Sequence, residues 1–304
     1  ILVSLFACCA FAQEATTTVA SSSGSTAGHS EVHLREVLQN KKFEDDRTLT
    51  DAKLRADAGS LSRYSLRASV SYYGPTLNDF GAKDQPNPDG SPGPYRTALG
   101  GSLGLRVRFS PTQTMSLSGG MKATYPFHGM ERFDINDPSV SYDFSSRIGN
   151  LQMRNSPGFS VITVPEYTRV GETSALEYKN ALVYGLGASG FALSFDTSFG
   201  YFFYNRGYET RDQRASRNNL GLSPGVKYNF NDKFNMNVSL NQSFYNPRES
   251  ASPWIMWNRT LTQSIGFGYA IRPDIYISPY FRMYPTRLAA DTTTFNLSTS
   301  LSVF

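Results

Sequence analysis

The sequence of 304 residues contains little cysteine and no long apolar run. Its two cysteines, Cys8 and Cys9, are adjacent near the start, so we expect no disulfide framework elsewhere. No stretch of about eighteen apolar residues occurs and mean hydropathy is −0.36, which excludes a transmembrane helix. The net charge of +4 is small and the basic residues are scattered, so nucleic acid is not an expected partner.

Residues 1–12 are interpreted as part of a signal peptide. They are apolar and end in Ala10-Phe-Ala12, an A-x-A site for signal peptidase. Cleavage after Ala12 would remove both cysteines. A lipoprotein signal ending at Cys8 is the alternative, although Phe6 suits that motif poorly.

Residues 13–60 are interpreted as a periplasmic arm of low complexity with short helices. Residues 13–29 are rich in Thr, Ser, Ala and Gly, and hold too little apolar surface to fold. Between 30 and 58, leucines among charges indicate one or two helices, with Ser30 and Thr50 as candidate N-caps. The narrow apolar stripe favours a loosely ordered arm, and a plug or docking helix is the alternative.

From Leu61 to Phe304 the chain alternates between apolar and polar residues. In the segment 234–244 the even positions are Asn or Ser, and the odd positions are apolar except Gln242. Successive side chains of a β-strand point to opposite faces, so each such segment has one apolar and one polar face. The pattern predicts about twelve strands. We place them at residues 61–73, 97–110, 114–127, 139–147, 158–168, 175–187, 191–204, 219–230, 233–245, 260–272, 275–285 and 293–304.

The connections between these strands alternate in length, and aromatic residues collect at the strand ends. Short connections at one end and long polar loops at the other are typical of single-chain bacterial barrels, and aromatic rings settle at headgroup depth. The short connections are 111–113, 188–190, 231–232 and 273–274, and the long ones are 74–96, 128–138, 205–218 and 246–259. We expect the long loops outside the cell and the short turns in the periplasm.

The A-x-A signal, the amphipathic strands and a last strand ending in Phe304 resemble bacterial outer-membrane β-barrels of the porin and transporter type. The resemblance covers 61–304 and is architectural. It implies an all-β fold, a transmembrane antiparallel up-and-down β-barrel in the bacterial outer membrane. Membrane lipid and the outer-membrane assembly machinery are the implied partners. Phe304 departs from the pattern, because it falls in register with the polar row of its strand and not with the lipid-facing row.

The polar row of the barrel carries charges that predict a function. A Lys or Arg facing the bilayer midplane costs about 2–4 kcal/mol, so these side chains should point into the lumen. A net-basic lumen would suit a channel or transporter for small polar solutes with a weak anion preference, and a lumen filled by ion-paired side chains is the alternative. The expected lumen-lining residues are Arg67, Arg106, Arg108, Lys122, Asp143, Glu177, Lys179, Asp196, Lys227, Arg272, Tyr276, Tyr280 and Arg282.

Two other classes of function remain open. A structural or adhesive barrel could act through its outer loops, and the apolar segment 254–257 in a long loop would serve it. A rim enzyme could use His128 with Asp134 or Asp137, but no nucleophile motif accompanies this histidine. We therefore predict no enzyme activity, cofactor or metal site. The solute and the oligomeric state do not follow from the sequence.

Overall fold

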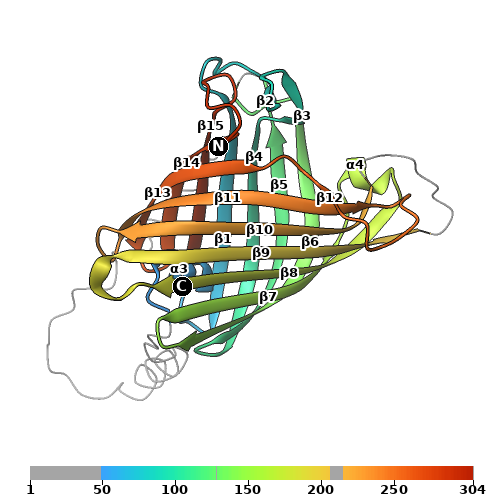
Figure 1. The fold of residues 1–304 in the computed structure, drawn as a ribbon. Coiled ribbons are helices and arrows are strands. Elements are labelled where there is room, and N and C mark those ends of the chain that lie inside the picture. The colour runs from blue at the N-terminus through green and yellow to red at the C-terminus, as the bar shows by residue number, and fades with distance from the viewer. Residues whose placement is uncertain (1–48, 128, 206–214, 304) are drawn as a thin grey trace, which may run out of the picture. The chain divides into compact units, whose positions relative to one another are not determined.

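The computed structural model describes residues 49–127, 129–205 and 215–303, which form a closed antiparallel β-barrel (Figure 1). Twelve strands make the wall, and β1 closes it by pairing with β15 as well as with β4. The predicted all-β class and strand number are confirmed. The wall strands are β1 (Tyr64–Thr76), β4 (Ala98–Ser110), β5 (Gln113–Thr124), β6 (Arg132–Ile148), β7 (Leu151–Val161), β8 (Glu172–Gly185), β9 (Phe191–Tyr204), β10 (Ser216–Asn229), β11 (Phe234–Pro247), β13 (Thr262–Arg272), β14 (Ile275–Met283) and β15 (Thr294–Val303).

A few short elements accompany the wall. The two-residue β12 (Trp257–Asn258) pairs with β11, and β2 (Asp84–Pro86) with β3 (Pro92–Arg96) forms a separate hairpin. The described helical segments are α3 (Ala52–Ala58), α4 (Pro165–Thr168) and the 3-10 turn η1 (Gly187–Ser189). In the described part of the chain, no helix is long and apolar enough to cross a membrane.

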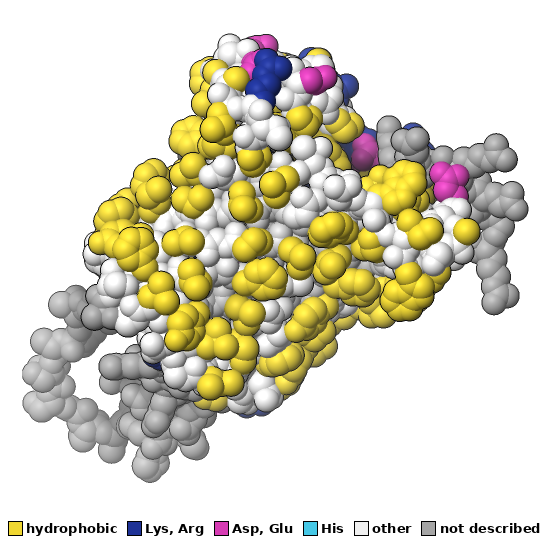
Figure 2. Space-filling model, in the orientation of Figure 1, with side chains coloured by type: hydrophobic (Ala, Val, Ile, Leu, Met, Phe, Trp, Pro, Cys, Tyr) yellow, Lys and Arg dark blue, Asp and Glu magenta, His cyan; other side chains and the backbone are white. Residues whose placement is uncertain are grey.

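The alternation of side chains along each strand separates the two surfaces of the wall. On β4, Leu103 and Leu105 are 47% and 63% exposed, whereas Arg106 on the opposite row is 1% exposed. The register continues the outer row across neighbouring strands, since Leu105 lies opposite Leu66 on β1 and Leu117 on β5. Figure 2 shows apolar side chains spread over the visible outer wall. An apolar surface of this extent requires lipid around it.

The connections sort by length at the two ends of the barrel, as predicted. Short turns join β4 to β5, β6 to β7, β8 to β9, β10 to β11 and β13 to β14. Long connections, at 77–97, 125–131, 162–171, 205–215, 248–261 and 284–293, join the strands at the opposite end. We call these the short-turn end and the long-loop end.

The fourth and fifth strands were predicted wrongly. The fourth begins at Arg132 and not at 139, and the fifth spans Leu151–Val161 and not 158–168. Pro165, which we placed inside the fifth strand, begins α4 in a long connection that the sequence did not reveal.

The physical reasons are local. The Asn136-Asp-Pro138 segment has the composition of a turn, but it lies at a register shift of β6, where a bulge accommodates it. Asn155 and Pro157 interrupt the apolar row of β7, which hides the alternation. The missed turn is Gly149-Asn150, and Gly149 has the positive φ of 58° that such a two-residue turn requires.

Aromatic rings line the outer wall at the short-turn end. Phe191 contacts Tyr228 with a centroid distance of 4.7 Å, and Phe230 stacks on Phe234 at 5.0 Å. Phe234 in turn stacks on Phe267 at 5.9 Å. This series of rings from neighbouring strands matches the predicted girdle, because rings of this kind occupy the membrane interface.

Polar contacts hold the long loops together at the other end. The β2–β3 hairpin is joined to the 284–293 connection because the Tyr284 hydroxyl donates to the Pro86 carbonyl at 2.9 Å. Arg259 donates to the Tyr95 hydroxyl at 2.7 Å, which joins the hairpin to the 248–261 loop.

Candidate functional site

The barrel encloses α3, a short helix that precedes the first strand. The Asp51 side chain caps it by accepting a hydrogen bond from the Leu54 amide at 3.0 Å, so the N-cap is Asp51 and not Thr50. Gly59, with a φ of 78°, ends the helix. We call residues 49–60 the luminal segment. Its contacts with the barrel wall are those expected of a docked helix, and residues 13–48 of the predicted arm lie outside the described residues.

Apolar side chains pack the luminal segment against the wall. Leu54 is 2% exposed and clusters with Leu49, Val183 and Ala192. On another face of the helix, Ala52 and Ala56 cluster with Ala270 and Tyr276. Seven residues are too few for an isolated helix to be stable in water, so these contacts with the wall are what maintain it.

Two wall arginines bind the C-terminal end of the luminal segment. Arg106 donates to the carbonyls of Ala58 and Asp57, the latter at 2.9 Å. Arg108 donates to the carbonyls of Ser60 at 3.1 Å and Ala58 at 2.9 Å. The last carbonyls of a helix have no intrahelical partners and carry partial negative charge, which suits guanidinium groups. These arginines were predicted to line the lumen, and in the structure they are buried and hydrogen-bonded to the luminal segment.

A buried ion pair holds the N-terminal end. Lys227 Nζ lies 2.6 Å from Asp51 Oδ2, and the two side chains are 4% and 2% exposed. Gln152 Oε1 accepts hydrogen bonds from the amides of Thr50 and Asp51 at 2.7 and 3.0 Å. Burial raises the pKa of Asp51, but the charge and hydrogen bond of Lys227 outweigh it, so this pKa lies below its ordinary value.

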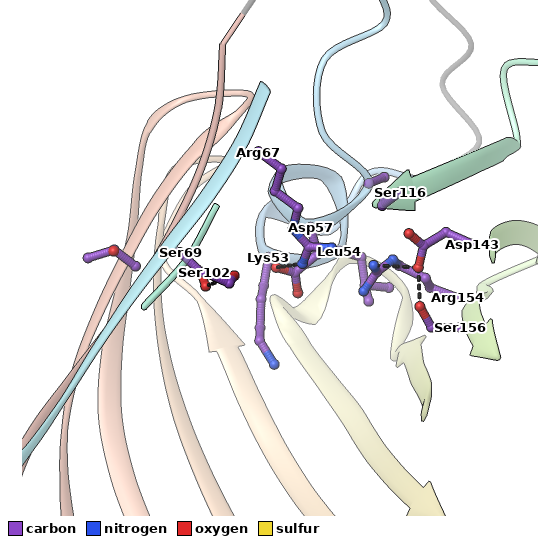
Figure 3. A network of polar contacts seen from close by, with 12 residues as sticks. Lys53, Leu54, Asp57, Arg67, Ser69, Ser102, Ser116, Asp143, Arg154 and Ser156 are labelled. Atoms are coloured by element: carbon purple, nitrogen blue, oxygen red, sulfur yellow. Dashed lines mark hydrogen bonds and ion pairs between the residues drawn. The ribbon is translucent and has the colours of Figure 1, made fainter. Parts of the chain in front are cut away.

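A second charge cluster lies beside Asp57, in the last turn of the helix (Figure 3). Arg154 Nη2 is 2.6 Å from Asp143 Oδ1, which also accepts a hydrogen bond from the Ser156 hydroxyl. The Nη2 atom of Arg67 lies 4.0 Å from the Oδ1 atom of Asp57 on the helix. Burial raises the pKa of Asp57, but the nearby charges of Arg154, Lys53 and Arg67, with a hydrogen bond from Ser300, lower it by more, so this pKa lies below its ordinary value.

Beside this helix the wall leaves a cavity of about 240 Å³. Opposite charges face it: Lys53 Nζ lies 3.6 Å from Asp196 Oδ2, and both side chains are nearly half exposed. Figure 3 shows Lys53 extending away from the helix. The lining residues are Lys53, Asp57, Arg154, Lys179, Asn180, Ala181, Asp196, Thr197, Ser198, Gly221 and Ser223.

The predicted lumen-lining residues divide into two groups. The first surrounds the luminal segment: Arg67, Arg106, Arg108, Asp143, Asp196, Lys227 and Tyr276. In the second group, Glu177 and Lys179 pair with each other at 2.7 Å, and Lys179 also lines the cavity beside the helix. Lys122, Tyr280 and Arg282 are partly exposed on the wall, and Arg272 is exposed beside the 273–274 turn.

Sequence reasoning missed some functional side chains. Asp51, Lys53 and Asp57 lie in a segment interpreted as outside the barrel. Gln152 and Arg154 lie in 148–157, which was interpreted as a connection. The alternation of Gln152, Arg154 and Ser156 with Leu151, Met153 and Asn155 was a signal that could have found them.

The residues considered for a rim enzyme either form polar contacts in the structure or lie outside the described residues. His128 lies outside the described residues, as do the signal peptide, most of the arm and Phe304. Asp134 pairs with Arg132 at 2.7 Å, and Asp137 accepts the Thr163 amide at 2.7 Å. Within the described ranges, no group of three or more His, Cys, Asp or Glu residues could hold a metal ion.

Comparison with known proteins gives similarity in structure but not in sequence. No protein-family model and no curated protein matches the chain. The structure of an outer membrane channel from Pseudomonas putida F1 is similar with a TM-score of 0.52 and 11% identity, covering 81% of this chain and 98% of that one. The NanC porin gives 0.43 at 11% identity over 79% and 98%.

The chain has the fold of bacterial outer-membrane β-barrels. The closed wall, the apolar outer surface and the sorted connections are all consistent with this assignment, which confirms the predicted architecture and the outer membrane as its location. At 11% identity the similarity shows the fold alone. Function therefore has to be argued from the luminal side chains.

Proposed function

We propose that this protein is an outer-membrane channel for small polar solutes, narrowed at its short-turn end by the luminal segment. The observation that carries the proposal is the cavity inside the wall, where charged side chains are half exposed. Ionised groups that face lipid or a dry core are costly, so Lys53, Asp196 and Lys179 require water around them.

The proposed lumen keeps a weak anion preference, but different residues carry it. Arg106, Arg108 and Lys227 are occupied by the luminal segment and contribute little to the field in the water. Lys179 is 66% exposed although paired with Glu177. Lys122 and Arg282 add positive charge elsewhere on the wall. The ion selectivity should therefore depend more on Lys179, Lys122 and Arg282 than on Arg106 and Arg108.

Conductance of the refolded full chain in a planar bilayer tests this proposal. We expect a small conductance for the unchanged protein, a larger one for Arg106→Gln/Arg108→Gln, and a reversal potential on the anion side at about 0.1 M salt, where the Debye length is about 10 Å. Lys233→Gln, at the exposed 230–233 turn, is the matched control for lost charge. Absence of conductance in every variant would refute the channel.

An adhesive barrel is the second candidate, favoured by one observation. Trp254 is 87% exposed and Trp257 is 53% exposed in the 248–261 loop. Exposed tryptophans are enriched at contact sites between proteins. Cells that display the protein should lose attachment to a partner surface when both tryptophans are replaced by Ser. Unchanged attachment would leave this loop without a binding role.

A further inference from the structure

The cavity beside α3 contains charges of both signs. Three cationic side chains, Lys53, Arg154 and Lys179, face it together with the acids Asp57 and Asp196. An anionic solute would meet the two acids, and a cationic solute would meet the three basic groups. An uncharged sugar would leave these groups only the ion pairs that they already form with one another and with the wall. A solute that carries both charges satisfies the cavity best.

The ion pair between two residues of the cavity lining is loosely bonded. Lys53 Nζ and Asp196 Oδ2 are 3.6 Å apart, longer than the usual 2.7–3.2 Å of a hydrogen bond, and their side chains are 42% and 46% exposed. Each therefore retains capacity to bond a ligand. In contrast, Arg154 is 11% exposed and is bonded to Asp143. It supports the cavity wall and its charge, and is less available for direct contact.

Shape limits the size of the solute. Small side chains on three neighbouring strands open the space: Ala181 on β8, Ser198 on β9, and Gly221 and Ser223 on β10. Drug-sized ligands usually occupy cavities of about 300–1,000 Å³. The cavity of about 240 Å³ fits a smaller molecule.

We propose that this cavity binds a small zwitterion of the free amino-acid class. The α-ammonium group would contact Asp196, and the α-carboxylate would contact Lys53 and Lys179. The two charged groups of such a solute are attached to one carbon, which matches opposite charges that lie side by side. The hydroxyls of Ser198 and Ser223 can bond a polar side chain. This inference rests on the proposed channel function and names the class of its solute. Solute binding can be measured independently of conductance, so the two proposals are tested separately.

Saturation-transfer NMR titrations of the folded full chain in detergent test the proposal. The probes are L-glutamine, glutaramate, which lacks the α-amine, and 4-aminobutanamide, which lacks the carboxylate. Glutamine should bind at least about tenfold more tightly than either analogue, since a lost hydrogen bond to a charged group costs about one such factor. Equal binding of glutaramate would show a plain anion site and overturn the proposal, as would absence of glutamine binding.

Variants separate the two halves of the site. Asp196→Asn should weaken glutamine about tenfold and strengthen glutaramate, whereas Lys179→Gln should weaken glutamine and strengthen 4-aminobutanamide. Lys233→Gln lies outside the cavity and should change nothing. Heat-modifiable migration on gels checks that each variant is folded. Variants that weaken all three probes equally would contradict the assigned contacts.

The outcomes for solute class and channel are distinguishable. A barrel that conducts ions but does not bind glutamine overturns the solute class and leaves the channel intact. A barrel that binds glutamine with the expected variant pattern supports the site, even if it fails to conduct and so refutes the channel.

Discussion

Replacing Lys227 with Gln should release the luminal segment from the wall. The substitution leaves the Asp51 carboxylate, 2% exposed, without its partner at 2.6 Å. Removing one member of a buried ion pair costs about 3–5 kcal/mol. At 1.4 kcal/mol for each factor of ten, docking of residues 49–60 weakens by about a hundredfold to a few thousandfold.

Limited trypsin digestion of the folded barrel measures this release. Lys53 and Arg55 provide cleavage sites inside the luminal segment, so mass spectrometry should detect their cleavage in Lys227→Gln and protection in the unchanged protein. In the double variant Asp51→Asn/Lys227→Gln neither charge remains, and protection should largely return. Lys233→Gln is the control. Full protection of Lys53 and Arg55 in Lys227→Gln would refute the role assigned to the buried pair.

Three further predictions follow from the fold and the charges. Leu105→Arg should prevent assembly or destabilise the barrel by about 2–4 kcal/mol in urea unfolding from liposomes, whereas Ser102→Arg on the inner row should be tolerated, and equal tolerance would mean that no lipid faces Leu105. Because the pKa of Asp51 lies below its ordinary value of 3.8, its ion pair is complete above that pH and is lost as the pH falls through the lowered pKa, so conductance should be flat from pH 5 to 8 and rise only at a pH below 3.8. Proteases added to intact cells should cut the long connections, including 162–171, and cuts confined to the short turns would invert the topology.

The strands of the barrel wall could be predicted because the alternation of apolar and polar residues is repeated in each of them. A two-residue period on β4 or β11 follows from lipid on one side and polar contacts on the other, and each strand carries that signal independently. Where one strand breaks the rule, as Asn155 and Pro157 do on β7, the boundary is lost even though the strand number survives.

The interior was less predictable, because alternation shows which row a side chain occupies but not what it contacts. Arg106 and Arg108 belong to the inner row as expected, yet their partners are carbonyls of residues about fifty positions earlier in the chain. A segment of seven helical residues has no periodic signal long enough to reveal an apolar face. Only the tertiary structure shows that Leu54 packs against Val183 and Ala192.

The width of the barrel interior explains why a luminal segment can fit inside it. A barrel of about eight strands can be filled by its own side chains, and one of sixteen leaves an aqueous channel. In this barrel, small residues such as Gly104 and Ser118 stand opposite one another on the inner row of β4 and β5, so these two strands fill little of the space beside them. The luminal segment supplies volume at one end, and the buried charges of Arg106, Arg108 and Lys227 hold it there. The same charges that fix this segment are thereby removed from the water, and in the proposed channel solute recognition would depend on the exposed charges of Lys53, Lys179 and Asp196.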